Sequence, residues 1–326
     1  MDVAFLTEMG FEGKIPSNHS NMRTEFAWMN ALNADHRHIH HFGEVKGYDH
    51  VFVIFPKGRV YLDACGSQLI EDKNPVSDLL IKELVERLKL TNKKVYVVQE
   101  GPHWWWNDYS MYDQIRFFNM MVSCDGIFAH NEHDVKYYKG MFTNVPVHVI
   151  PTLMIDSIVE DIQPVREEKV IIGGNFARWY GGMESFTVAQ KFEVPIWGQT
   201  SHAMREGEDQ LVNHLPRVMW TDWMKQLSSF KYAVHLMPTI AAGTFSLNCA
   251  YFGIPCIGNE KVDTQRLCHP DLAVDVEDVE KAVILAKRLK NDEEFYLKCS
   301  KTAQENYKKY YSQELFKEKI NTILGI

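Results

Sequence analysis

Residues 242–255 read Ala-Gly-Thr-Phe-Ser-Leu-Asn-Cys-Ala-Tyr-Phe-Gly-Ile-Pro, and this stretch decides the fold prediction. Gly243 predicts a tight loop, Thr244 and Ser246 mark the start of a helix, and Gly-x-Pro leads into an apolar strand at 255–257. Free N–H groups, hydroxyls and the helix dipole together predict an anion site at this helix start. The alternative is that Thr244 serves only as the N-cap of the helix.

A glycine pair follows another apolar strand earlier in the chain. The strand at 170–172 runs directly into Gly173 and Gly174, with Asn175 and Arg178 shortly after. Ligands of open parallel sheets bind beyond the carboxyl ends of strands. Glycines let a backbone approach a phosphate closely, and an arginine can grip diphosphate oxygens in a bidentate fork. The alternative is a tight turn whose glycines serve only the backbone geometry.

Outward from these two stretches, short apolar runs alternate with helical periodicity along the whole chain. This alternation is typical of βαβ units and parallel sheets. The clearest strands are expected at 3–6, 51–55, 95–98, 126–129 and 232–236, and the clearest helices at 77–90, 111–122, 132–141, 244–252 and 312–324. The acidic stretch 155–168 has weak periodicity and predicts the connection between two domains.

We therefore predict an α/β protein of two Rossmann-like domains facing a central cleft. Residues 1–155 would form an acceptor domain and residues 156–311 a nucleotide-sugar donor domain. Residues 312–326 would form a C-terminal helix that packs back on the first domain. A length of 326 residues agrees with two domains, because single cores rarely grow to that size.

The composition excludes several other classes of protein. The hydrophobic share of 45% and charged share of 24% are those of a globular chain, and the net charge of -8 disfavours a partner held only through phosphates. The six cysteines form no C-x-x-C pair, which favours a reduced compartment. No basic leader or membrane-length apolar run is present. We expect a cytoplasmic monomer or dimer without stable membrane insertion.

The stretch 242–255 resembles the donor-site signature of GT-B glycosyltransferases. In that family a glycine loop and small polar residues hold the diphosphate of a nucleotide sugar, and the segment closes with Gly-x-Pro. The family's ribose-binding Glu corresponds here to Asn248, whose amide can still hydrogen-bond ribose hydroxyls. Together with the glycine pair and the glycine that ends the strand at 195–197, the expected donor contacts are Gly173, Gly174, Asn175, Arg178, Gly198, Gly243, Thr244, Phe245, Ser246 and Asn248.

Within GT-B enzymes the layout is most similar to the bacteriophage DNA glucosyltransferases. Their second domain opens with a strand, Gly-Gly-Ser-Phe, an Arg and a nearby Glu-Ser; here Gly173-Gly-Asn-Phe, Arg178 and Glu184-Ser185 stand in that order, with a longer gap. The resemblance implies that Arg178 contacts the diphosphate. It also implies that Glu100, at the end of Lys-Val-Tyr-Val-Val-Gln-Glu, is the catalytic base.

Glu100 also qualifies from its position alone. A carboxylate at the tip of an apolar strand, just before Gly101 and Pro102, can deprotonate an acceptor hydroxyl within hydrogen-bond reach. The alternative is a solvated loop glutamate.

His103 and three tryptophans follow Glu100 after Gly101 and Pro102. Three adjacent tryptophans cannot all face one core, so we expect at least one in the cleft, where its ring could stack on a sugar or a base. An aromatic plug under a loop is the alternative. With the loop near the N-terminus, the expected acceptor contacts are Gly13, Lys14, His19, Arg23, His103, Trp104 and Trp105.

A run of histidines at 36–41 is the densest in the chain. In an extended strand His36, His38 and His40 would share one face and could hold a metal, but an exposed loop or edge is the favoured interpretation, and we predict no metal. The expected activity is transfer of a sugar from a nucleotide sugar, a UDP-sugar in particular, without a divalent metal. The leading acceptor is a hydroxymethylated base in phage DNA, which makes DNA an expected partner. A glycan or lipid-linked acceptor, or a non-catalytic nucleotide- or sugar-binding module, remains the alternative.

Overall fold

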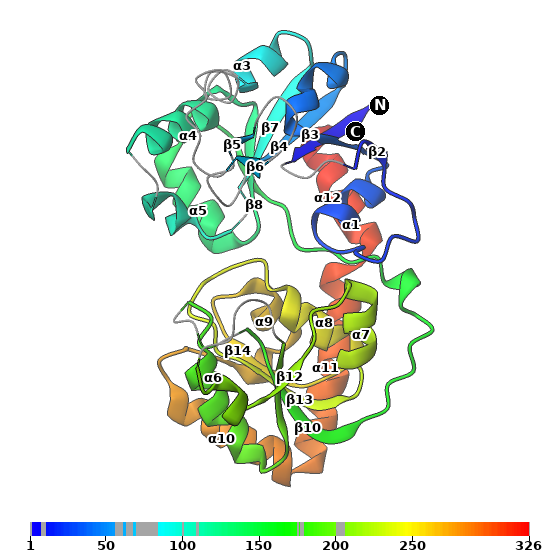
Figure 1. Ribbon diagram of the computed structural model, residues 1–326, viewed down its shortest axis with the longest axis vertical. Helices are drawn as coiled ribbons and strands as arrows, with labels where there is room; N and C mark the ends of the chain where they lie inside the picture. The colour runs from blue at the N-terminus through cyan, green and yellow to red at the C-terminus, as the bar shows by residue number, and fades with distance from the viewer. Residues whose placement is uncertain are drawn as a thin grey trace. The chain divides into compact units, whose positions relative to one another are not determined.

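The computed structural model describes two compact units (Figure 1). The described residues are 2–7, 11–55, 61–62, 68–69, 84–99, 101–108, 111–174, 176, 179–199 and 206–325. Unit 1 consists of residues 1–19, 25–151 and 317–326, and unit 2 of residues 20–24 and 152–316. Each unit has its own sheet and its own hydrophobic core.

The sheet of unit 1 has the strand order β2-β3-β1-β4-β7-β8-β9. Neighbouring strands are parallel except β2, which pairs antiparallel with β3. The strands are β1 (Val3–Thr7), β2 (Gly13–Lys14), β3 (Asp35–His38), β4 (His50–Phe55), β7 (Lys94–Gln99), β8 (Gly126–Ala129) and β9 (Val147–Val149); β5 (Tyr61–Leu62) and β6 (Gln68–Leu69) form a separate antiparallel pair. The central strands are buried along their length, as expected for a parallel sheet covered on both faces.

Helices and 3₁₀ turns connect the strands of unit 1. They are α1 (Glu25–Ala31), η1 (Ile39–Val45), α3 (Leu84–Lys89), η2 (His103–Asp108), α4 (Met111–Ser123) and α5 (Glu132–Met141). The α5 helix starts where the sequence predicts, because the Asn131 side chain accepts a hydrogen bond from the Asp134 backbone N–H and so caps the helix.

The sheet of unit 2 is parallel throughout, with the order β12-β11-β10-β13-β14-β15. Its strands are β10 (Glu167–Ile172), β11 (Ile196–Gln199), β12 (Asn213–Leu215), β13 (Phe230–His235), β14 (Cys256–Asn259) and β15 (Ala273–Val274).

Helices cover both faces of this second sheet. The helices and 3₁₀ turns of unit 2 are η3 (Asp156–Ile158), α6 (Gly182–Ala189), η4 (Gln190–Phe192), η5 (Glu208–Gln210), α7 (Trp220–Leu227), α8 (Thr244–Phe252), α9 (Asp263–Cys268), η6 (Pro270–Leu272), α10 (Val279–Asn291) and α11 (Glu293–Tyr311). The last helix of the chain is α12 (Gln313–Leu324). Within unit 2, α6 contacts α10, whereas α8, α9 and α11 contact one another, and Figure 1 shows the first pair and the second group on opposite sides of the strands. From residue 317 onward, α12 belongs to unit 1.

In each sheet, successive strands are first added on one side of the starting strand and then on its other side. In unit 2 the chain moves outward from β10 through β11 to β12, and then returns to the other side of β10 as β13. In unit 1 the corresponding reversal lies between β1 and β4. These are the switch points at which open α/β sheets bind ligands. The prediction of two α/β halves with mainly parallel sheets is confirmed.

Two further observations concern the helices and the cysteines of the described residues. None of the described helices has the length and apolar character required to cross a membrane. The cysteines of the described part of the chain, Cys124, Cys249, Cys256, Cys268 and Cys299, are all free and buried.

Candidate functional site

The switch point of unit 2 brings together the ends of two strands. Gly173 follows β10 directly and its N–H donates to the Val234 carbonyl of the neighbouring strand at 2.9 Å. His235 is the last residue of β13. The carboxyl ends of β10 and β13 therefore lie side by side, and the loops that follow these strands form the candidate site.

Gly173 has no room for a side chain. A Cβ at this position would lie 2.6 Å from Cγ of His235 and 2.9 Å from Cδ1 of Phe245. The two rings themselves meet edge to face, with their centroids 5.0 Å apart. The structure thus brings two of the predicted donor residues, Gly173 and Phe245, together around a histidine.

Two helices begin at this edge, and both begin with a left-handed glycine. Gly181 precedes α6 with φ 63°, and Gly243 precedes α8 with φ 72°. Neither helix has a side-chain cap, so the amides of both first turns lack an intrahelical acceptor as well as a cap. Such amides, together with the positive end of the helix dipole, are the elements of a phosphate site.

Close packing holds both glycines in place. A Cβ on Gly181 would lie 1.9 Å from the Leu236 carbonyl oxygen, in the loop after β13. The same loop is fixed to α6 by the Leu236 N–H, which donates to the buried Ser185 hydroxyl at 2.9 Å. A Cβ on Gly243 would lie 1.9 Å from Oγ1 of Thr264.

A pair of hydroxyls fixes the loop before α8. Oγ of Ser246 lies 2.7 Å from Oγ1 of Thr264, and both hydroxyls lie within hydrogen-bond distance of the Gly243 carbonyl oxygen, at 3.1 Å and 2.8 Å. Two protons therefore serve three contacts, and the Ser246 proton is used inside the loop. Thr244 lies within the helix and Gly243 is its N-cap, so the alternative that Thr244 is the N-cap is wrong.

Three polar side chains beside these helix starts have a buried atom without a partner among the described residues. They are His235 (Nε2), Asn248 (Oδ1) and His269 (Nδ1). Asn248 lies one turn into α8 and is 1% exposed. His269 uses its other ring nitrogen, which lies 3.0 Å from the Ser246 carbonyl oxygen. Unpaired buried polar atoms are rare in proteins and are expected to be found where a ligand or an ordered water completes the pairing.

Burial keeps both histidines neutral. Loss of solvation lowers the pKa of His235 from 6.5 to about 4. The same cause lowers the pKa of His269 to about 4, against a smaller opposing effect of its bond to the Ser246 carbonyl. At neutral pH the site therefore offers imidazole N–H groups and lone pairs, but no histidine charge.

The remaining predicted donor residues are distributed as follows. Gly174 has φ 82°, and a Cβ on it would lie 2.9 Å from Cβ of Tyr180. Gly198 lies inside β11 and pairs with Ile172 of β10. Asn175 and Arg178 lie outside the described residues.

In unit 1, two predicted acceptor residues follow the carboxyl end of β7. His103 and Trp104 open η2, directly after Gly101 and Pro102. Glu100 and the side chain of Trp105 lie outside the described part of the chain.

The other predicted acceptor residues do not gather there. Lys14 pairs with Asp35 at 3.2 Å, at the amino end of β3, and Gly13 precedes it on the antiparallel edge strand. The His19 ring stacks on Phe26 at 4.8 Å. Arg23 belongs to unit 2, where it bridges to Met154.

The histidine run is divided between two elements. His36 is buried in β3, and both its ring nitrogens are used: Nε2 lies 2.7 Å from the Thr7 hydroxyl, and Nδ1 accepts from the Phe11 N–H at 3.1 Å. The strand ends at His38, so the chain does not continue extended to His40.

Sequence reasoning missed His235, Gly181 and Thr264. A histidine at the end of the apolar strand around Tyr232 was a usable signal, since strand ends in parallel sheets carry ligand contacts. Thr264 is 21 residues from its partner Gly243, and nothing local in the sequence connects them.

No protein-family model and no curated protein matches this sequence. Solved structures do match. An α-glucosyltransferase in complex with UDP and a 13-mer DNA containing an HMU base superposes with a TM-score of 0.67 at 12% identity, over 100% of both chains. Sucrose-phosphate synthase from Thermosynechococcus elongatus gives 0.57 at 12% identity, over 99% of this chain and 98% of its own.

TarM of S. aureus, solved with fondaparinux, α-GlcNAc-glycerol and UDP, gives a TM-score of 0.62 at 10% identity, over 88% of this chain. This chain spans only 58% of that TarM chain. At such identities the likeness establishes the fold. The chain has the two-domain α/β architecture of GT-B glycosyltransferases, as the sequence predicts.

The packing around Gly173 generates a stability prediction. Gly173→Ala should lower the free energy of unfolding by about 1–3 kcal/mol, because the methyl group must displace the rings of His235 and Phe245. Gly198→Ala is the matched control, since its Cβ would meet its nearest neighbours at 3.7 Å and 3.8 Å, which is ordinary contact. Urea unfolding measures both, and equal stability of the two variants would contradict the close approach at Gly173.

The buried histidines generate a pH prediction. Their folded-state pKa of about 4 lies below the unfolded value of 6.5, so between these values the unfolded chain binds protons that the folded chain does not. Stability should be fully present above pH 6.5 and be lost as the pH falls toward 4. Each histidine contributes a slope of about 1.4 kcal/mol per pH unit within that window.

His269→Gln tests this slope, because it keeps a polar side chain and removes the titration. Urea unfolding between pH 6.5 and 4.5 should give a shallower loss of stability for the variant than for the natural chain. Parallel pH profiles would show that His269 is not buried in its neutral form.

Proposed function

We propose that this chain is a glycosyltransferase that moves a sugar from a UDP-sugar to a hydroxyl acceptor. The observation that carries the proposal is the pair of uncapped helix starts, α6 and α8, at the switch point of unit 2. A diphosphate bridging these two starts would accept hydrogen bonds from first-turn amides of both helices. The solved structures with UDP support this choice of nucleotide.

The reaction exchanges one C–O bond for another. The bond between the anomeric carbon of the sugar and the diphosphate oxygen breaks, and a bond from that carbon to the acceptor oxygen forms. The leaving UDP takes the electron pair of the broken bond, and the acceptor hydroxyl loses its proton to a base. Donors fixed in advance around the diphosphate stabilise the charge that develops on it.

We assign the roles in this reaction from the sequence and the resemblance. Arg178 would hold the diphosphate, alongside the first-turn amides of α6 and α8. Glu100 would take the proton of the acceptor. Asn248, whose Oδ1 lacks a partner and which lies one turn from the α8 start, would hydrogen-bond the ribose. This transfer needs no divalent metal at the donor site.

For the acceptor, we propose a hydroxymethylated base in DNA. The α-glucosyltransferase that matches over the full length of both chains was solved with DNA containing an HMU base, which supports this choice. A glycan or lipid-linked acceptor is the second candidate, because TarM was solved with α-GlcNAc-glycerol and has the same fold. Incubation with UDP-glucose and either hydroxymethylated DNA or a glycan separates the two, and a chain that binds UDP but transfers to neither acceptor would be a binding module.

Donor binding is tested first. UDP should raise the melting temperature of the natural chain, since a ligand that binds only the folded state stabilises it. Arg178→Ala should weaken UDP binding by about 2–4 kcal/mol if its contact is bidentate. Arg288→Ala is the control, because this exposed arginine lies in the last turn of α10. Equal UDP affinity in Arg178→Ala and Arg288→Ala would assign Arg178 a different role.

The base is tested by Glu100→Gln, which keeps the shape of the side chain and removes the proton acceptor. We expect normal UDP affinity and a transfer rate lower by about 10²–10⁴-fold. Glu86→Gln, an exposed glutamate of α3, is the control and should retain full activity. Near-normal turnover of Glu100→Gln would place the base elsewhere.

A further inference from the structure

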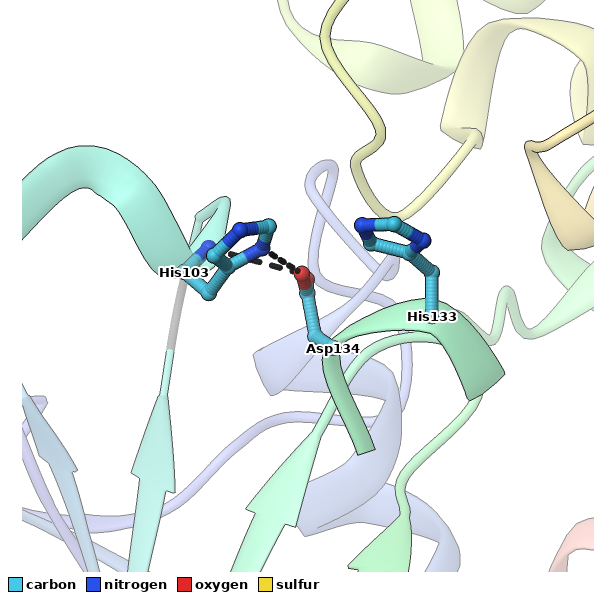
Figure 2. A group of neighbouring side chains, drawn as sticks. All are labelled: His103, His133 and Asp134. Carbon is cyan, nitrogen blue, oxygen red and sulfur yellow. Dashed lines mark hydrogen bonds and ion pairs between the residues drawn. The ribbon is translucent and has the colours of Figure 1, made fainter. Parts of the chain in front are cut away.

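Unit 1 contains a cluster of possible metal ligands, of which only His103 is also an expected acceptor contact. His103, His133 and Asp134 each offer one ligand atom, and these atoms all lie within 4.8 Å of one another (Figure 2). Within the part of the chain that the structure describes, this is the one group of three such residues. Its residues come from two segments, η2 after β7 and the first turn of α5 after β8.

Asp134 is held before any ligand arrives. Asp134 is fully buried. One oxygen of its carboxylate, Oδ2, accepts a hydrogen bond from the Asn131 side-chain amide at 2.9 Å. The other oxygen, Oδ1, faces His103, whose Nδ1 lies 2.8 Å away. Carboxylates that bind metals are commonly oriented in this way, with one oxygen hydrogen-bonded to a neighbouring residue and the other oxygen left to bind the ion.

His103 is also fixed, whereas His133 can adjust. The His103 ring packs on Tyr137 with centroids 4.2 Å apart, and the His103 backbone N–H also points to Oδ1 of Asp134, at 3.4 Å. His133 is exposed, and its ring lies 5.2 Å from that of His103. The site thus has two positioned ligands and one that can close on an ion from the solvent side.

We propose that His103, His133 and Asp134 bind one divalent transition-metal ion, Zn²⁺ in particular. Two imidazoles and a carboxylate are ligands that Zn²⁺ accepts, and tetrahedral coordination at about 2.0–2.2 Å places the ligand atoms about 3.3–3.6 Å apart. Nδ1 of His103 and Oδ1 of Asp134, now 2.8 Å apart, would separate to that spacing once the proton between them leaves, and rotation of the exposed His133 ring would bring the third nitrogen to it. Water fills the fourth position, on the exposed side of the cluster.

The local charges support a cation here. The first turn of α5 carries Glu132 and Asp134, and these two carboxylates offset the positive end of the helix dipole. The proton that His103 shares with Asp134 must leave if Nδ1 becomes the ligand, and it is released to water. No electron transfer or other reaction is required.

The ion would join two ligand-bearing loops of one sheet. His103 opens η2, the segment that carries Trp104, and α5 begins just after β8, the strand beside β7. A metal bound to both would hold η2 against α5 at the carboxyl edge of the unit 1 sheet. Zn²⁺ binding at this cluster does not depend on the proposed function, because it is measured as metal affinity without any sugar donor or acceptor.

The test is calorimetric titration of the metal-free, full-length chain with ZnCl₂ at pH 7.5. We expect one saturable site per chain. His133→Ala should weaken Zn²⁺ binding at least about tenfold, and its folding should be unaffected because the ring is exposed. His103→Ala should weaken binding as well. His41→Ala is the control: this exposed histidine, paired with Glu12 at 3.0 Å in another part of unit 1, should leave the affinity unchanged.

Two results would overturn the proposal. The first is absence of saturable Zn²⁺ binding in the natural chain. The second is a Zn²⁺ affinity that His133→Ala leaves unchanged, which would place the metal on other residues. A second measurement with Co²⁺ supports or refutes the geometry independently, because tetrahedral coordination by these residues should give a visible absorption band that disappears in His133→Ala.

Discussion

A side chain at residue 173 would collide with two rings, because its Cβ would lie 2.6 Å from His235 and 2.9 Å from Phe245. This close approach joins the end of β10, the end of β13 and the start of α8 in one place. Gly181 and Gly243 are constrained in the same way. A Cβ on Gly181 would lie 1.9 Å from the Leu236 carbonyl oxygen, and a Cβ on Gly243 would lie 1.9 Å from Oγ1 of Thr264. Gly173, Gly181 and Gly243 have no side chain to fill this edge of the sheet. The proposed diphosphate site depends on the amides at the starts of α6 and α8.

Much of this fold could be predicted because its signals are local. The bounds of α5 and α8 agree with the prediction at both ends, since Asn131 caps the first and glycines bracket the second. Apolar runs bounded by polar or glycine residues located the buried strands. Strand β3 was harder to predict, because its sequence Asp-His-Arg-His is polar. Its backbone is held extended by parallel pairing with β1. Tertiary pairing of this kind has no signature in a single sequence.

The candidate site was predictable only in part, for the same reason. The glycine loops stand out in the sequence, but the environment of a side chain does not. Ser246 reads as a phosphate ligand, yet its hydroxyl is used by Thr264 and Gly243. His235 reads as the end of a strand, yet it is the group that requires a glycine at 173. Likewise, the run at 36–41 attracts attention as a metal site, whereas the clustered ligands come from His103, His133 and Asp134. His103 lies 31 positions before Asp134, and the parallel pairing of β7 with β8 brings the segments that follow these strands together.

The central claim is that UDP binds at the helix starts of unit 2, and hydrogen–deuterium exchange of the full chain with and without UDP tests it most directly. Amides that bond a phosphate exchange more slowly than amides open to water. We expect UDP to slow exchange in the first turns of α6 and α8, while α3 and α4 of unit 1 keep their rates. Protection confined to unit 1, or no protection at a saturating concentration of UDP, would contradict it.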